Sequence, residues 1–117
     1  MTQVNFFKTD NGRSPVEEFL DALPSKQAQK VAWVLSLIED LEMVPTKYFK
    51  KLVNTDDIWE VRVVSGNNIF RILGFFDGPK VVILNHAFQK KTQKTPKQAI
   101  NIAEKRKQLY LRRKINE

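Results

Sequence analysis

The spacing of apolar residues in the first 45 positions predicts one strand and two helices. Residues 4–8 (VNFFK) form a short β-prone run. Ser14-Pro15-Val16-Glu17 has the composition of a helix start, because serine can cap the helix, proline suits its first position and glutamate can bond back to the cap. From Ser25, apolar residues recur at intervals of three and four, which predicts a longer helix that ends before Pro45. Its apolar stripe comprises Val31, Val34, Leu35, Ile38 and Leu41, and Trp33 and Leu37 widen it.

Beyond Pro45 the residues favour strands. Candidate strands, rich in β-branched and aromatic residues, cover 48–53, 58–64, 69–76 and 80–88. Short turns at 65–68 and 77–79 join the last three strands into an antiparallel meander. Thr95-Pro96-Lys97-Gln98 then repeats the composition of a helix start, with Thr95 as the expected cap of a final helix.

The resulting order of elements is β-α-α-β-β-β-β-α. A group of helices with a largely antiparallel sheet defines an α+β fold, and we expect the helices to pack on one face of the sheet. The length of 117 residues suits a single domain over residues 1–117 and is too short for two ordinary domains.

Composition excludes several kinds of chemistry. The chain has no cysteine and one histidine, so it has neither disulfides nor a thiolate nucleophile, and a conventional zinc site is not expected. No apolar run approaches the roughly 20 residues that span a bilayer, and the first residues do not have the pattern of a signal peptide. We therefore expect a cytoplasmic protein that has no membrane partner.

Charge is distributed unevenly along the chain, which has a net charge of +7 and a pI of about 9.8. Residues 1–42 carry four basic and seven acidic side chains, whereas residues 43–117 carry sixteen basic and six acidic ones. A positive field attracts polyanions, and a pI above about 9 is typical of domains that bind nucleic acid. Charge alone leaves open both a nucleic-acid-binding protein and a protein that is merely basic.

Two arginines lie inside the expected central strands. Because side chains alternate along a strand, Glu60 and Arg62 share one face. The other face of that strand is wholly apolar and should meet the helices; it carries Trp59, Val61 and Val63. Arg71 lies among apolar residues of the next strand, and a desolvated cation is costly unless it is paired. Each arginine either forms a surface salt bridge with an acid such as Glu60 or lines a concave face that receives phosphate.

Three lysines, Lys90, Lys91 and Lys94, follow the last strand. Like charges that gather on one surface repel each other, so an anionic partner explains this cluster more simply than a structural role does.

Three segments in this order, IWEVR, FRILGFFDG and HAFQKKTQKTP, resemble the HigB-like branch of the RelE/ParE toxin superfamily, many members of which are phage-derived. The resemblance covers nearly the whole chain, and the strand-to-lysine motif FQKKTQKTP is its most specific part. It implies a RelE-like fold, in which an N-terminal strand and a helical hairpin pack on a mainly antiparallel sheet that is followed by a basic C-terminal helix.

The resemblance also implies a function. Members are toxins of type II toxin–antitoxin modules, and each is silenced by a cognate antitoxin, which we expect here to be a helix-turn-helix protein. RelE- and HigB-like toxins cleave messenger RNA on the ribosome with no metal and no small-molecule cofactor, and the ribose 2′-hydroxyl attacks the adjacent phosphate. Two alternatives remain, a ParE-like inhibitor of DNA gyrase and a catalytically degenerate protein that only binds its antitoxin.

By the same resemblance, Arg62 and Arg71 fall on strand positions that carry basic active-site residues, and Lys90 or Lys91 falls on the basic position after the last strand. The general base is left open between a lysine of this cluster, Glu60 and His86. Strand parity groups His86 with Leu84 and Phe88, so it is equally explained as a packed histidine. The C-terminal segment YLRRKINE departs from the family pattern, because only Tyr110 is available there as an acid or base.

Further cations continue towards the C-terminus. They either form a solvated helix face or contact RNA phosphates or an acidic antitoxin. With Lys94, the candidate RNA-binding residues are Lys97, Lys105, Arg106, Arg112 and Arg113.

Overall fold

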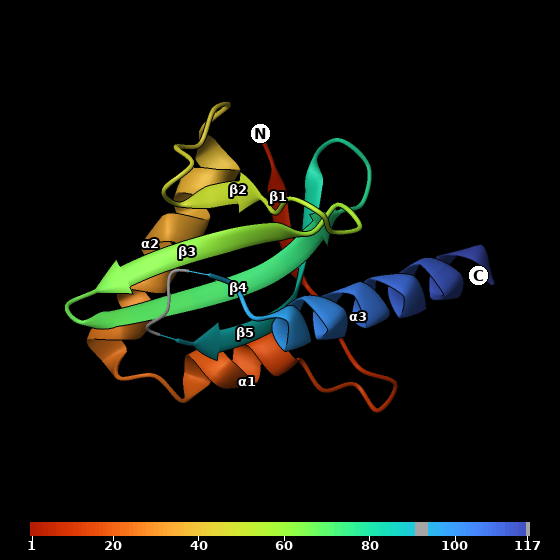
Figure 1. The fold of residues 1–117 in the computed structure, drawn as a ribbon, viewed down its shortest axis with the longest axis horizontal. Coiled ribbons are helices and arrows are strands. Elements are labelled where there is room, and N and C mark those ends of the chain that lie inside the picture. The colour runs from red at the N-terminus through yellow and green to blue at the C-terminus, as the bar shows by residue number, and fades with distance from the viewer. Residues whose placement is uncertain (91–93, 117) are drawn as a thin grey trace.

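The computed structural model describes residues 1–90 and 94–116, and within them it contains the eight elements in the expected order (Figure 1). These are β1 (Gln3–Phe6), α1 (Pro15–Asp21), α2 (Ser25–Asp40), β2 (Phe49–Lys51), β3 (Trp59–Ser65), β4 (Asn68–Phe76), β5 (Val81–Gln89) and α3 (Lys97–Ile115). None of the helices formed by the described residues is long and apolar enough to cross a lipid bilayer.

The strands form one sheet in the order β1-β5-β4-β3-β2. β2, β3, β4 and β5 pair antiparallel in chain order, as the meander requires. β1 runs parallel to β5, with Gln3–Phe6 opposite Val81–Leu84. The predicted α+β class is confirmed, with a mixed and mostly antiparallel sheet.

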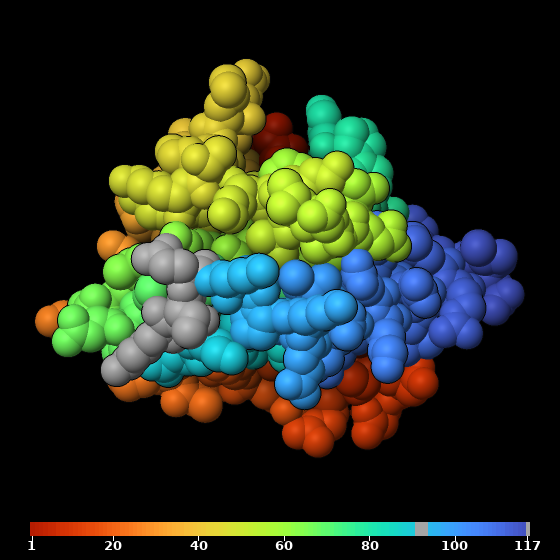
Figure 2. All heavy atoms as spheres, viewed as in Figure 1, coloured from red at the N-terminus to blue at the C-terminus, as the bar shows by residue number. Residues whose placement is uncertain are grey.

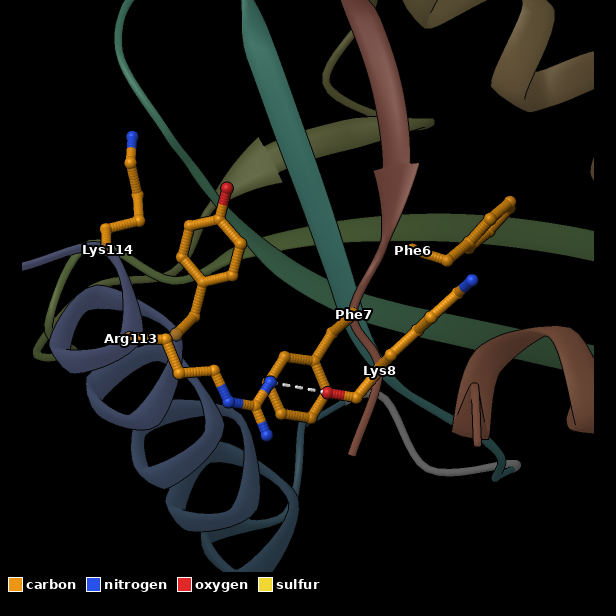
Figure 3. A pocket seen from close by; sticks show the side chains of 6 residues that line it. Phe6, Phe7, Lys8, Arg113 and Lys114 are labelled. Atoms are coloured by element: carbon orange, nitrogen blue, oxygen red, sulfur yellow. Dashed lines mark hydrogen bonds between the residues drawn. The ribbon is translucent and has the colours of Figure 1, made fainter. Parts of the chain in front are cut away.

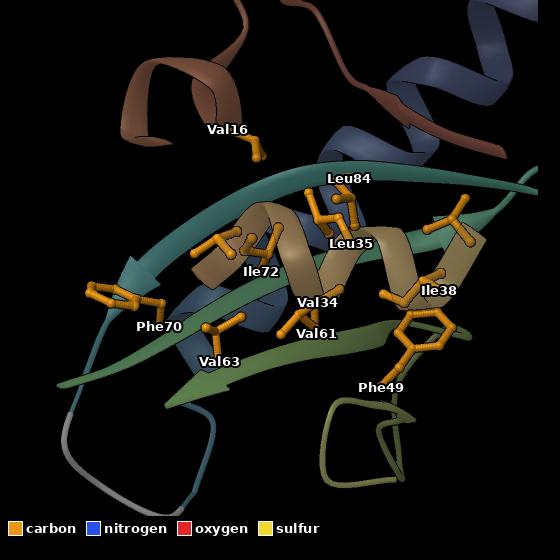
Figure 4. Packing of buried hydrophobic residues seen from close by; sticks show 12 residues of the cluster. Val16, Val34, Leu35, Ile38, Phe49, Val61, Val63, Phe70, Ile72 and Leu84 are labelled. Atoms are coloured by element: carbon orange, nitrogen blue, oxygen red, sulfur yellow. The ribbon is translucent and has the colours of Figure 1, made fainter. Parts of the chain in front are cut away.

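α1 and α2 cover one face of this sheet (Figure 1). Ser14 caps α1 as expected, because its Oγ accepts a hydrogen bond from the Glu17 N–H. The predicted inward face of β3 is confirmed, since Val61 and Val63 are fully buried beneath α2. Figure 4 shows this core, in which the α2 stripe meets apolar side chains of the sheet.

α3 packs on the opposite face of the sheet, so the expectation that all helices lie on one face is wrong. The reason lies in β4, which is apolar on both faces: Ile72 points into the α2 core and Leu73 into a cluster with Ala99 and Ala103 of α3. A strand that is apolar on both faces needs a layer on each side. In Figure 1, α3 lies in front of the sheet and α2 behind it.

A β-bulge interrupts the pairing of β4 with β5. Leu73 lies opposite His86 and Gly74 opposite Leu84, so Asn85 is an additional residue on β5. A bulge changes the face to which the following side chains point. Leu84 belongs to the α2 core, whereas Phe88 packs against the α3 cluster and His86 stacks on Phe88 with ring centroids 5.4 Å apart. The parity that grouped His86 with Leu84 is therefore wrong.

Candidate functional site

α3 packs against only part of its sheet face. Its apolar residues pack against Ile58 and Leu73 and, further along, against Phe75 and Ile83. Glu60, Arg62 and Arg71 project on the same face, nearer to the turn between β3 and β4. Figure 2 views the molecule from this side, with the first turns of α3 (light blue) across the middle and the segments around β2 (yellow) above them.

A buried ion pair lies at the centre of this face. Arg71 Nη1 donates to Glu60 Oε1 at 2.9 Å, and each side chain is only 1% exposed. The two residues are diagonal neighbours, because Glu60 lies opposite Leu73 and Arg71 lies two residues away on the same face. The Thr95 hydroxyl donates to the second carboxylate oxygen, Oε2. A buried charge is tolerated only when its partner and further hydrogen bonds replace water, and this arrangement supplies both.

This pair determines what Glu60 and Arg71 can do. Of the two interpretations of Arg71, the structure shows the salt bridge with Glu60, although it is buried and not at the surface. Both carboxylate oxygens of Glu60 already accept hydrogen bonds, so Glu60 is poorly placed to act as a general base. The contacts of Glu60 and Arg71 therefore indicate a structural role for the pair.

Thr95 does not cap α3, contrary to the expectation from the sequence. The helix begins at Lys97 with Pro96 in the cap position, and no side chain caps it. The hydroxyl of Thr95 instead contacts Glu60, because the chain crosses the sheet face directly above the buried carboxylate. This hydrogen bond attaches the start of α3 to β3.

Lysines of β2 and of the segment before α3 lie near this pair. A cavity of about 310 Å³ beside Thr95 is lined by Lys50, Lys51 and Lys94, together with apolar residues. Lys50 is the cross-strand partner of Glu60, whereas Lys51 forms an exposed ion pair with Asp57 at 2.7 Å. Lys50 was not expected from the sequence, although the pairing of Phe49–Lys51 with β3 places it on the same face as Glu60.

Arg62 lies directly opposite Arg71 in the ladder, but its side chain has other surroundings. It lines a separate cavity at the sheet edge with Lys30, Lys47 and Tyr48. Its Nε is buried and has no hydrogen-bond acceptor among the described residues. The two arginines thus share a face, as expected, yet do not converge on one hollow.

His86 and Lys90 line another cavity of about 310 Å³, between the end of β5 and the first turns of α3. Lys90 continues the pairing with β4, because its N–H donates to the Ile69 carbonyl at 3.2 Å. Lys91, the alternative to Lys90 in the expected site, lies outside the described residues.

Burial, and secondarily the positive charge of Arg106, lower the pKa of His86 to about 4. The imidazole is therefore neutral at pH 7 and is a weak base. Its stacking on Phe88 and its low pKa favour the packed histidine over the general base.

Replacing His86 by glutamine is expected to reduce the loss of stability at low pH. A histidine in the unfolded chain has a pKa of about 6.5, so between pH 6.5 and 4 the unfolded state binds more protons and stability falls as the pH is lowered. Allowing for partial exposure of the imidazole, His86 accounts for a loss of about 1–2 kcal/mol in the free energy of unfolding when the pH is lowered from 7 to 4.5. Urea unfolding at pH 7 and pH 4.5 measures it. If the wild type and His86→Gln lose equal stability between pH 7 and pH 4.5, His86 is not a buried neutral histidine.

Several C-terminal cations hold α3 against the rest of the protein. Arg106 Nη1 donates to the Asn85 carbonyl at 2.6 Å. Arg113 donates to the Lys8 carbonyl at 2.6 Å, and its guanidinium lies over the Phe7 ring (Figure 3). Lys97, Lys105 and Arg112 are exposed to solvent. Of the expected RNA-binding residues, Arg106 and Arg113 thus have structural contacts, and Lys94 lies beside the buried pair.

The described residues contain no group of three or more His, Asp or Glu side chains arranged to hold a metal ion. Positive charge on the face around Glu60 and Arg71 comes from lysine and arginine side chains of separate elements. Such an arrangement is suited to holding a phosphodiester.

The fold and this cationic face define a small α+β protein with the architecture expected of RelE-like toxins. Residues 18–108 match the family of phage-derived Gp49-like proteins (DUF891), and the chain belongs to this family. The family is part of the HigB/RelE-like toxin group. A comparison with curated proteins gave no match.

Proposed function

We propose that this protein is the toxin of a type II toxin–antitoxin module and a metal-independent endoribonuclease that cleaves messenger RNA on the ribosome. The observation that carries the proposal is the placement of cations from several elements around the buried Glu60–Arg71 pair, in a member of a toxin family. A cognate antitoxin, of the helix-turn-helix type, would silence it.

The chemistry requires little beyond charge and positioning. The 2′-hydroxyl loses its proton and attacks the adjacent phosphorus, the bond to the 5′-oxygen breaks, and that oxygen is protonated as it leaves. Lys90 and Lys94 would stabilise the extra negative charge of the phosphorane, and Arg62, which lines a separate cavity, would bind a neighbouring phosphate. Glu60 and Arg71 would keep the strand-to-helix connection in place. Because Glu60 and His86 are poor bases here, positioning on the ribosome would supply much of the rate enhancement.

A second candidate is a catalytically degenerate protein that binds only its antitoxin. One observation favours it: Arg71, the arginine expected to bind phosphate, is buried and paired with Glu60. A ParE-like action on gyrase has no such support, but the same experiment tests it.

The experiment is brief induction of the protein in bacteria, with primer extension to map the ends of translated messages. We expect new ends within open reading frames. In the variant with both Arg62→Ala and Lys94→Ala, the rate of message cleavage should fall at least about 100-fold. Loss of a single donor to a developing charge costs a factor of about 10²–10³ in rate. Lys80→Ala, an exposed lysine in the β4–β5 turn, is the matched control and should cleave normally.

The variants must retain the wild-type melting temperature. Undiminished cleavage by the folded double variant contradicts the site. Absence of message cleavage by the wild type contradicts the endoribonuclease activity. In that case, DNA damage would indicate a gyrase inhibitor. A protein that is harmless but still binds its antitoxin would indicate a catalytically degenerate toxin.

A further inference from the structure

The cavity lined by Arg62 lies at the edge of the sheet. It measures about 240 Å³ and is lined by Lys30 of α2, Lys47 and Tyr48 ahead of β2, and Arg62 and Val64 of β3. The cavity lies where β2 stops pairing with β3, since their ladder covers only residues 59–61 of β3. One further hydrogen bond, from the Arg62 N–H to the Tyr48 carbonyl at 2.8 Å, continues the contact.

The charge of this cavity is not balanced by acidic side chains. Three of its lining residues are cations, and none of those that the structure describes is acidic. No ion pair joins Lys30, Lys47 or Arg62 to a described carboxylate. Clustered like charges raise the energy of the free protein, and a bound anion would relieve this repulsion.

Aromatic rings hold two of these cations. The Lys47 ammonium lies 4.9 Å from the centroid of the Tyr48 ring, and the Lys30 ammonium lies 5.2 Å from that of Trp33. Trp33 and Tyr48 meet edge to face with centroids 5.7 Å apart. The two rings and their cations therefore form one continuous surface on the molecule.

Trp33 is 47% exposed, although the sequence pattern placed it in the apolar stripe of α2. A half-exposed tryptophan beside a second aromatic ring and several cations is the combination by which proteins bind single-stranded nucleic acid, because bases stack on the rings while cations hold the phosphates.

Arg62 connects this surface to the proposed cleavage site. It lies opposite Arg71 in the ladder and also lines the cavity. Arg62 is half-buried, and its side chain contributes positive charge to the lining of the cavity. A chain of nucleotides that contacts both regions would pass along the end of β3.

We propose that Lys30, Trp33, Lys47, Tyr48 and Arg62 form a binding site for single-stranded RNA. A base stacks against the exposed part of Trp33, and its phosphate is bound by the three cations. The inference extends the proposed function, because the site binds nucleotides that flank the scissile linkage.

The test uses the purified protein and a fluorescently labelled 2′-O-methyl RNA decamer, which lacks the attacking hydroxyl and is not cleaved. We expect Trp33→Ala to weaken binding about 10-fold or more, since loss of a ring on which one base stacks typically costs a factor of about 5–150. Lys30→Ala and Lys47→Ala should each lower the slope of log K against log salt by about 0.7. The β4–β5 turn lies at the opposite end of the strands from the β3–β4 turn (Figure 1), so Lys80→Ala in the β4–β5 turn serves as the control and should bind like the wild type.

A spectroscopic readout is independent of affinity. The chain contains two tryptophans, so Trp59→Phe leaves Trp33 as the only one, and the decamer should quench its fluorescence. A self-complementary RNA duplex, whose bases are already stacked, should bind more weakly and quench less.

Unchanged affinity of Trp33→Ala, or equal binding of duplex and single strand, overturns the inference. So does a Trp33→Ala variant that weakens binding of a polyglutamate peptide but not of RNA, because the surface would then be a protein interface. Message cleavage is measured separately: stacking without cleavage contradicts only the proposed function, and cleavage without stacking contradicts only this site.

Discussion

Replacing Glu60 by alanine should destabilise the protein by about 3–5 kcal/mol, because Arg71 would remain charged and buried without its carboxylate. The change also removes the acceptor of the Thr95 hydroxyl, so the start of α3 loses its attachment to β3. Urea unfolding at pH 7 gives the free energy of unfolding of both proteins.

The control replaces the whole pair by apolar residues, Glu60→Leu with Arg71→Met. Buried ion pairs exchanged for apolar side chains of similar volume are often neutral or stabilising, so this double variant should be within about 1 kcal/mol of the wild type or above it. If Glu60→Ala lowers the free energy of unfolding by less than about 1 kcal/mol, Glu60 is not the buried partner of the Arg71 charge.

Replacing Gly74 by alanine is the second change with a large expected effect. A Cβ built at Gly74 lies 2.3 Å from the Ile83 carbonyl oxygen and 3.0 Å from Leu84 Cα, which are both backbone atoms of β5. Because backbone cannot rotate away, β4 and β5 must separate, and we expect a loss of about 3 kcal/mol. The separation would also displace the bulge at Asn85 and with it His86.

Gly66→Ala isolates the effect of backbone conformation. Gly66 has φ of 59° in the β3–β4 turn and open space around its Cβ position, so alanine there costs only about 1–2 kcal/mol of strain. Thermal unfolding of the two variants measures the difference. Equal losses at Gly74 and Gly66 contradict the steric explanation.

The order of elements and the faces of β3 and β4 follow from the sequence, because apolar periodicity reflects burial directly. The face of His86 does not follow, because one additional residue in β5 reverses the parity of every residue after it. Gly74 is the one local sign of that bulge, since a glycine inside a strand marks a close approach of another backbone.

The charged residues of the site could be identified from the sequence, but the residues with which each of them pairs could not. Glu60, Arg62 and Arg71 alternate along paired strands, so a shared face could be predicted. Which arginine pairs with Glu60 depends on the diagonal offset between β3 and β4 and on where Thr95 crosses the sheet. The residues next to Thr95 have the composition of a helix start, so the local sequence predicted that Thr95 caps α3. Its actual partner, Glu60, lies 35 residues earlier and does not affect that local pattern.

The parallel pairing of β1 with β5 joins the first strand of the chain to the last. During synthesis, Gln3–Phe6 cannot pair with β5 until the ribosome has added Val81–Leu84. At typical elongation rates this takes on the order of 4–16 s. Throughout that interval Val4 and Phe6 have no neighbouring strand. A nascent copy therefore cannot complete its sheet until most of its own message has been read.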